Sequence, residues 1–320
     1  MMENLADVLM RTVIQKKNPS VIGLDPDLAK MPACYKVSRS SDCPLQDVAE
    51  AIIQYNKDII DAIHELIPAV KPQIAFYEKY GSHGIRAFEE TVAYAKEKGL
   101  VVIEDGKRND IGNTARAYAD GHLGLVEGLG GEMIPAFDVD FLTVSTYLGS
   151  ESLAPFVEVC KASNKGIFIL VKTSNSGSGE IQNVKAENGK SVSENVARYV
   201  ATHSEAFVGS RGYSPIGAVV GATYPEEAAV LRRIMPKSIF LVPGYGSQGA
   251  GAKDVMPCFN SDGLGAVINS ARNILYGHLT EETRLTISKA DYLQQVIRAT
   301  ADMQQDIYQT LKVTYPEMVY

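Results

Sequence analysis

Short runs of valine, isoleucine and other apolar residues recur along the chain, separated by longer segments with helical periodicity. The runs are nearly continuous and lack the apolar-polar alternation of a half-exposed strand. This pattern is typical of parallel strands that are buried on both faces. It predicts eight strands, at residues 21–25, 69–75, 101–107, 141–145, 167–173, 216–223, 239–244 and 266–270.

The segments between these strands carry apolar residues at three- and four-residue spacing. In residues 47–66 this spacing gathers Val48, Ile52, Tyr55, Ile59, Ile63 and Leu66 on one face of a helix. Similar patterns occupy residues 84–98, 114–129 and 225–234. A strand followed by a helix, repeated around a sheet, predicts an α/β fold of the closed (β/α)8 TIM-barrel type. A doubly wound open sheet is the competing fold, but no GxGxxG motif follows the first strand.

Four segments lie outside the strand-helix repeat. Residues 1–20 resemble an amphipathic helix, and residues 31–43 are polar with Pro and Ser. Residues 174–189 are rich in Gly, Ser and Asn and begin at the carboxyl end of a strand, where barrels carry their active sites. They are equally compatible with a lid and with a plain surface loop. Residues 289–312 form a long helical pattern that could cap the barrel or contact another subunit. We expect residues 1–320 to form a single domain.

Composition narrows the class of protein further. The 320 residues are 45% hydrophobic and 22% charged, as in ordinary globular proteins. A net charge of −7 without long blocks of like charge argues against a nucleic-acid partner. The cysteines, Cys34, Cys43, Cys160 and Cys258, form no CxxC pair and are typical of reduced thiols. Without a signal peptide or a membrane-length apolar window, we expect a cytoplasmic protein with no membrane partner.

Polar residues cluster where the apolar runs stop. They are Asp25 after the first run, Lys71 and Gln73 in the second, Asp105, Lys107, Asp110 and Thr114 at the third, Lys172, Thr173 and Ser174 at the fifth, and Asn269, Ser270 and Arg272 at the last. Charged groups are rarely buried unless they are paired. Their recurrence at one end of successive strands is the pattern of a barrel active site.

The central pair of this pattern is Asp105-x-Lys107. Alternate residues of a strand share one face, so both side chains should point into the barrel mouth. The pair alone is equally compatible with catalysis and with a buried ion pair that orients the barrel. Asp110 could likewise be no more than a favourable residue near a helix N-terminus. Lys71 on the preceding strand favours catalysis, because so many charges in one region exceed what stability requires.

A second candidate site is the turn PGYGSQ, residues 243–248. Gly244 and Gly246 allow the backbone to approach a ligand and to present N–H groups. Arg272, after the last strand, can add a forked contact to phosphate oxygens. Taken alone, the glycines could simply form a tight turn, and Arg272 could be an ordinary surface residue. Together they favour a phosphate site, which barrels often place after their last two strands.

The motifs VIGLDPD, VKPQIAFYE, DGKRNDIGNT, LVKTSN and PGYGSQ, with the final Arg272, together resemble orotidine 5′-phosphate decarboxylase, in the longer subfamily of that enzyme. The likeness runs from about residue 21 to residue 272. The D-x-K-x-x-D element by itself is shared with related sugar-phosphate decarboxylases and synthases.

The resemblance implies decarboxylation of orotidine 5′-monophosphate to UMP in de novo pyrimidine biosynthesis, without a cofactor or metal. Lys71, Asp105, Lys107 and Asp110 would form an alternating charge network, with Lys107 protonating C6 and Asp110 supplied by the partner of a homodimer with shared sites. The implied substrate-binding residues are Asp25, Gln73, Ile111, Thr114, Thr173, Ser174, Pro243, Gly244, Gly246, Gln248 and Arg272. Of these, Asp25 would hold ribose hydroxyls, and Gln248 with Arg272 would bind phosphate. Gln73 stands where we expect Asn in this family, which leaves its role open.

Two other functions remain to be weighed. A related barrel decarboxylase or aldolase would use a divalent metal held by paired carboxylates. Glu104 adjoins Asp105, but adjacent strand residues face opposite ways and cannot easily share one ion. The second is a non-catalytic nucleotide-binding protein. Loss of Lys107 or of one aspartate would have favoured this function, but the lysine and the aspartates are present.

Overall fold

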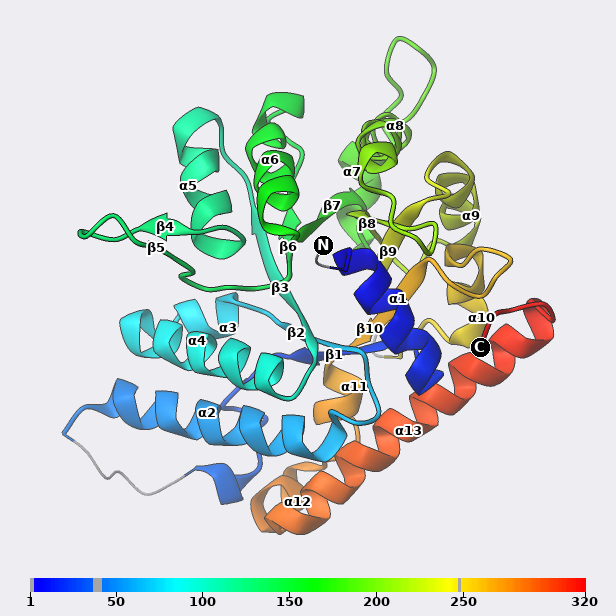
Figure 1. Cartoon of the computed structure of the whole chain (residues 1–320). Helices are drawn as coiled ribbons and strands as arrows, with labels where there is room; N and C mark the ends of the chain where they lie inside the picture. Colours follow the sequence, from blue (N-terminus) through cyan, green and yellow to red (C-terminus); the bar gives the residue numbers. More distant parts are fainter. Residues whose placement is uncertain (1–2, 37–41, 247–248) are drawn as a thin grey trace.

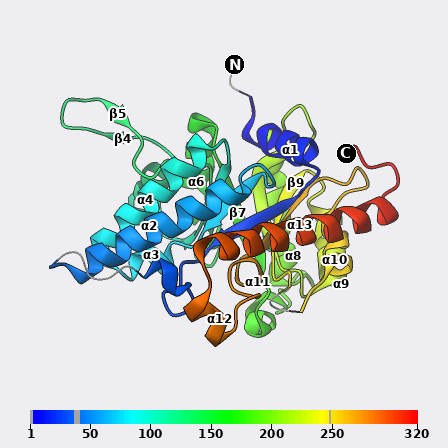
Figure 2. The same ribbon diagram turned by 90° about the horizontal axis from the view of Figure 1, so that it is seen from below.

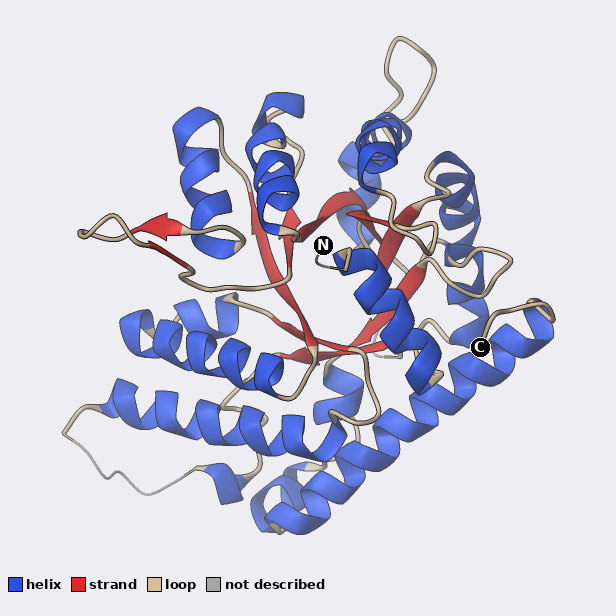
Figure 3. Ribbon diagram, viewed as in Figure 1, coloured by secondary structure: helices blue, strands red, loops and turns tan. Residues whose placement is uncertain are grey.

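The computed structural model describes residues 3–36, 42–246 and 249–320. Within these residues parallel strands close into a barrel in the order β1-β10-β9-β8-β7-β6-β3-β2, which confirms the expected TIM barrel. Figure 3 shows the strands as a central ring with helices outside it. The barrel strands are β1 Ser20–Leu24, β2 Ala69–Pro72, β3 Val101–Arg108, β6 Phe141–Val144, β7 Gly166–Lys172, β8 Ser214–Val220, β9 Ser238–Pro243 and β10 Ala266–Ser270.

Helices connect the strands and extend beyond them at both ends of the chain. They are α1 Leu5–Lys16, α2 Pro44–Ile63, α3 Ala75–Glu78, α4 Gly81–Glu97, α5 Gly112–His122, α6 Ala154–Ser163, α7 Gly179–Gln182, α8 Val192–Ser204, α9 Pro225–Ile234, α10 Ala252–Val255, α11 Arg272–Leu275, α12 Glu281–Thr286 and α13 Lys289–Thr314. None of the helices in the described part of the chain is both long and apolar enough to cross a membrane.

Helix α1 closes one end of the barrel and leaves the other end for the site (Figure 1). Its apolar residues pack against inward-facing strand residues, among them Phe141 and Phe168, whose rings stack 4.8 Å apart. The buried carboxylate of Asp7 accepts hydrogen bonds from the backbone of Ser210 and Arg211, in the loop that precedes β8. Helix α1 therefore covers the amino ends of the strands.

The long helix α13 runs along the outside of the barrel and packs against α2 (Figure 2). Its Tyr292 hydroxyl hydrogen-bonds the Tyr55 hydroxyl of α2 at 2.7 Å, in a buried cluster that also contains Tyr35. The helix expected at residues 289–312 is thus present as α13, and it fastens the C-terminal part of the chain to α2.

Several expected boundaries differ from the structure. The strand expected at 69–75 ends at Pro72, because the chain turns directly into α3. The helix expected at 114–129 ends at His122 and is followed by a hairpin, β4 Val126–Glu127 and β5 Met133–Ile134, which turns through glycines such as Gly131 with φ +83°. The glycine- and serine-rich segment 174–189 contains a 3-10 turn, Ser176–Ser178, and the short helix α7.

Candidate active site

One carboxylate at the mouth of the barrel is held between two ammonium groups. Asp105 of β3 places Oδ2 2.7 Å from Nζ of Lys71, at the end of β2, and Oδ1 2.5 Å from Nζ of Lys107. The Lys71 side chain is 5% exposed and that of Asp105 14%, whereas the Lys107 side chain is 47% exposed. Lys107 is therefore the cation of the trio that a ligand at the barrel mouth can reach.

Neighbouring charges set the protonation states of Asp105 and Lys71. Burial alone would raise the pKa of Asp105, but the charges of Lys71 and Lys107 and the hydrogen bonds from both outweigh it and hold the pKa well below its ordinary value. Burial alone would lower the pKa of Lys71, but Asp105 and Asp25 raise it above its ordinary value. Both groups are thus charged at neutral pH.

Asp25 joins this cluster from the end of β1. Its carboxyl group is close enough to feel the charges of four other site residues, Lys71, Asp105, Lys107 and Arg272. Burial raises the pKa of Asp25 above its ordinary value, and the charge of Asp105 adds to this effect. Its buried Oδ1 has no hydrogen-bond partner within the described chain. A buried acceptor without a hydrogen bond costs free energy, and a hydroxyl group of a ligand could donate the missing bond.

The regular alternation of side chains between the two faces of β3, expected for Asp105 and Lys107, is interrupted by a shift in strand pairing. Glu104 pairs with Leu142 of β6 and Arg108 with Val144, so β3 carries extra residues between these two points. Lys107 has φ +45°, a conformation that costs a non-glycine residue about 1–3 kcal/mol. Bulges of this kind re-aim side chains beside active sites.

Thr143 of β6 was not among the expected site residues, yet it contacts both members of the central pair. Its hydroxyl accepts a hydrogen bond from the Lys107 N–H at 2.9 Å and donates one to Asp105 Oδ1 at 3.1 Å. The side chain is buried. The only signal in the sequence is a hydroxyl within the apolar run FLTV, on the next barrel strand after β3.

Glu104 lies on the other side of β3, as expected from strand geometry. Its Oε2 is 2.7 Å from Nδ1 of His122 on α5, and both side chains are buried. Glu104 and Asp105 therefore do not share a ligand. No group of three or more metal-ligating side chains occurs within the residues that the structure describes.

The glycine-containing turn that begins at Pro243 follows β9 and lies beside α11. Gly244 and Gly246 have φ +107° and +75°, which only glycine adopts readily. A Cβ at Gly246 would lie 3.2 Å from the side chain of Asn273, the neighbour of Arg272. The turn therefore packs against the residue that follows Arg272 in α11. Gln248 lies outside the described residues.

Thr173, Ser174 and Gln73 lie at the ends of their strands. The Thr173 hydroxyl accepts a hydrogen bond from Gln182 of α7 and donates one to Asn175. It therefore links the end of β7 to the 174–189 segment. Ser174 offers its carbonyl oxygen to the Thr223 hydroxyl, 3.2 Å away. Gln73 directly follows β2, and its backbone N–H donates to the carbonyl of Leu24 in β1.

Asp110, Ile111 and Thr114 are not joined to the cluster of the same chain. Asp110 accepts a hydrogen bond from the N–H of Ile111 at 2.8 Å and, within the described residues, forms no ion pair with Lys71 or Lys107. Ile111 is 49% exposed and Thr114 is exposed, at the start of α5. Ile111 and Thr114 are thus exposed, and Asp110 beside them is partly buried.

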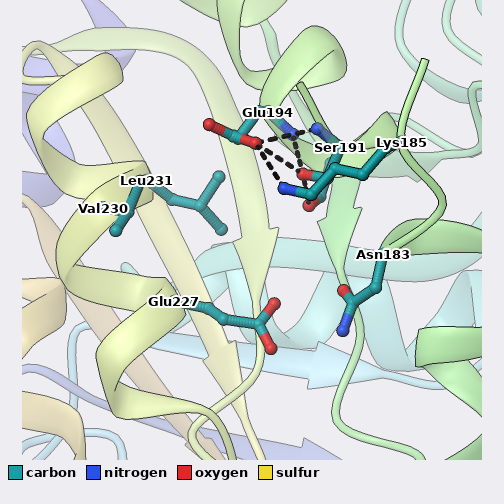
Figure 4. A pocket seen from close by; sticks show the side chains of 8 residues that line it. Asn183, Lys185, Ser191, Glu194, Glu227, Val230 and Leu231 are labelled. Carbon is teal, nitrogen blue, oxygen red and sulfur yellow. Dashed lines mark hydrogen bonds and ion pairs between the residues drawn. The ribbon is translucent and has the colours of Figure 1, made fainter. Parts of the chain in front are cut away.

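A separate pocket of about 340 Å³ lies between α8 and α9 (Figure 4). Glu227 and Asn183 line it, and both also bind the buried ammonium of Lys172, at 2.9 and 2.7 Å. Lys172 thus fastens the 174–189 segment to α9. The pocket contains none of the residues of the Lys71, Asp105 and Lys107 cluster.

Comparison with known proteins identifies the family of this chain. The family described as orotidine 5′-phosphate decarboxylase / HUMPS matches residues 22–284. The orotidine 5′-phosphate decarboxylase of Rhodopirellula baltica is 43% identical over 306 residues, which cover 96% of this chain and 99% of that protein. The one from Caldicellulosiruptor saccharolyticus is 39% identical over 280 residues, covering 87% and 91%. The solved structure of the Leishmania donovani OMP decarboxylase superposes with a TM-score of 0.65 at 26% identity, covering 94% of this chain and 99% of that one. The chain therefore belongs to the orotidine 5′-phosphate decarboxylase / HUMPS family, and the relatives that it matches are the orotidine 5′-phosphate decarboxylases, which are carboxy-lyases.

Proposed function

We propose that the chain converts orotidine 5′-monophosphate to UMP without a cofactor, as in pyrimidine biosynthesis, with Lys107 as the proton donor. The observation that carries this proposal is the Asp105 carboxylate held between Lys71 and Lys107. Of the two lysines, Lys71 is locked in a buried pair, whereas Lys107 is exposed enough to reach a substrate.

The reaction breaks the bond between C6 of the pyrimidine and its carboxylate carbon, and the electron pair stays on C6. No adjacent carbonyl delocalises this charge, so a fixed cation has to stabilise it. The Lys107 ammonium supplies that charge in a preorganised position and then transfers a proton to C6. The products are carbon dioxide and UMP, and the neutral amine of Lys107 regains a proton from solvent.

The remaining residues hold the nucleotide at a distance from the reacting carbon. We assign ribose hydroxyls to Asp25, whose buried Oδ1 lacks a partner within the described chain. We assign phosphate to Arg272, to Gln248 and to the turn of Pro243, Gly244 and Gly246. Thr173 and Ser174 would lie near the base, with Gln73 beside them, and the 174–189 segment would serve as the lid. Binding energy from the remote phosphate can then assist chemistry at the ring.

We further propose a homodimer in which Asp110, Ile111 and Thr114 complete the partner's site. Ile111 and Thr114 are exposed, and among the described residues Asp110 forms no ion pair with either lysine of its own chain, which supports this assignment. Exposed apolar side chains surround the same region: Leu125, Leu129, Met133 and Ile134 in or beside the β4–β5 hairpin, and Tyr147 and Leu148 after β6. Figures 1 and 2 both show this hairpin projecting from the barrel. Exposed apolar side chains on a projecting hairpin are typical of an interface.

The test follows the absorbance of orotidine 5′-monophosphate with the purified protein before and after exhaustive EDTA treatment. We expect turnover, and the same turnover after EDTA. Lys107→Ala should bind UMP but lose activity by several orders of magnitude. Absence of turnover at micromolar protein would favour a non-catalytic nucleotide-binding protein, and loss of activity on EDTA treatment would favour the metal-dependent alternative.

A further inference from the structure

The interrupted pairing between β3 and β6 leaves one backbone group of the central pair without a ladder partner. Regular pairing holds at Glu104 with Leu142 and resumes at Arg108 with Val144, where the Ser145 N–H donates to the Arg108 carbonyl at 2.9 Å. Between these points the Lys107 N–H turns to a side chain, the hydroxyl of Thr143, at 2.9 Å. The threonine thus replaces the backbone acceptor that the bulge removes.

The two hydrogen bonds of Thr143 fix each other's direction. A hydroxyl has one hydrogen to donate and lone pairs to accept. Because the Lys107 N–H can only donate, the single hydroxyl hydrogen is free to point at Asp105 Oδ1, 3.1 Å away. The same Oδ1 also receives the Lys107 ammonium at 2.5 Å. The contacts therefore form a closed ring, from the Lys107 backbone through Thr143 and Asp105 to the Lys107 side chain.

We infer that Thr143 is a positioning residue for decarboxylation, which fixes the Asp105 carboxylate and the left-handed backbone of Lys107 so that the ammonium is aimed at the reacting carbon. This inference rests on the proposed function of Lys107. Thr143 lies at β6, 1% exposed, and acts only through its neighbours. Its loss should therefore lower kcat and leave nucleotide binding nearly intact, because the ribose and phosphate contacts come from other strands.

The test compares Thr143→Val, which keeps the shape and removes the hydroxyl, with Thr143→Ser, which keeps the hydroxyl. The matched control is Thr91→Val in α4. Thr91 is also a buried threonine that accepts a hydrogen bond from Asn56 and donates one to the Ala87 carbonyl, and within the described residues it forms no hydrogen bond with Asp105 or Lys107. Thr143→Ala serves in place of the valine variant if valine prevents folding.

For Thr143→Val we expect a kcat about 10- to 100-fold lower, the range for loss of a hydrogen bond to a charged group. The KM and the UMP affinity should change by less than about threefold, since the remote contacts remain. Thr143→Ser should recover most of the kcat. Thr91→Val should lose stability in urea and keep the wild-type kcat.

Three results would overturn the inference: a wild-type kcat in Thr143→Val, an equal loss of kcat in Thr91→Val, or failure of serine to restore activity. A failure of the proposed function has a different signature. In that case the wild-type protein is itself inactive, or Lys107→Ala turns over normally. If Thr143→Val keeps the wild-type kcat and Lys107→Ala is inactive, the role of Thr143 is rejected and the proposed role of Lys107 stands.

Discussion

Glu104 and Asp105 are neighbours in β3, and their carboxylates lie on opposite faces of the strand. Glu104 pairs with His122 behind the strand, whereas Asp105 lies between Lys71 and Lys107 at the barrel mouth. Two buried carboxylates, one residue apart, thus meet different partners. This makes each the natural control for the other.

Asp105→Asn should impair both stability and chemistry. The change leaves the buried Lys71 without its counter-charge, which should lower the free energy of unfolding by about 3 kcal/mol. It also frees Lys107, and kcat should fall by at least about 100-fold. Glu104→Gln should destabilise the fold but keep kcat at temperatures where the variant is folded. Urea denaturation and steady-state rates measure both effects, and equal losses of kcat in the two variants would contradict the assignment.

Mixing two inactive variants tests the shared site. Asp110→Ala keeps Lys107, and Lys107→Ala keeps Asp110, so each mixed dimer contains one intact site if Asp110 acts across the interface. Free exchange of equal amounts should restore about a quarter of the wild-type sites. The measurement is the specific activity of the mixture after exchange has been verified by mass spectrometry. No recovery would place Asp110 in the site of its own chain.

Asp25→Asn should stabilise the nucleotide-free protein while weakening substrate binding. Because burial raises the folded pKa of Asp25, the ionised form opposes folding. Stability is therefore lost as pH rises from the unfolded pKa through the folded pKa, and the loss persists at pH 7. Asparagine removes the free-energy cost of the buried charge, so the urea midpoint of the variant at pH 7 should exceed that of the wild type. This difference in midpoint should shrink towards acid pH. The KM should increase by about tenfold or more, because a charge-assisted contact to the ribose is lost. A lower midpoint in the variant would show that the carboxylate stabilises the free protein.

The pairing of Lys71 with Asp105 should be insensitive to pH across the neutral range. The pKa of Asp105 is depressed, so its contribution to stability is complete above the unfolded pKa of about 4 and is lost only as pH falls through the folded value. The pKa of Lys71 is raised, so its contribution is complete below about pH 10 and is lost as pH rises through the folded value. The pair should therefore contribute a constant amount to the wild-type stability between about pH 5 and 9, whereas in Asp105→Asn the buried Lys71 loses a charge that raises its pKa and titrates at lower pH than in the wild type. Urea denaturation of both proteins measures this, and a free energy of unfolding that the substitution leaves unchanged at pH 7 would contradict the charged pair.

The barrel could be predicted because its strands are buried on both faces, so that apolar runs such as 167–173 and 266–270 stand out against helical periodicity. Short and exposed elements leave no such signal. The β4 and β5 strands each span two residues, largely exposed, and the helical pattern before them continued past His122.

The charge cluster could also be predicted in part. Lys71, Asp105 and Asp25 carry charge at strand ends, where burial without a partner would be costly, and the structure brings them together. The bulge in β3 could not be predicted, since it depends on how β3 pairs with β6 rather than on either sequence alone. Thr143 was missed for the same reason: its importance comes from a neighbour 36 residues away in sequence.

The barrel closes where β1 pairs with β10, which brings Ser20 beside Ile268 from nearly opposite ends of the chain. Asp25 and Arg272 follow these two strands, one on each side of that seam. A growing polypeptide therefore acquires its lysines and carboxylates long before it acquires the arginine assigned to phosphate, and the site is completed only by the last strand to leave the ribosome. A nucleotide held by both residues would act as a staple across the seam, so that an occupied barrel resists opening at the joint that forms last.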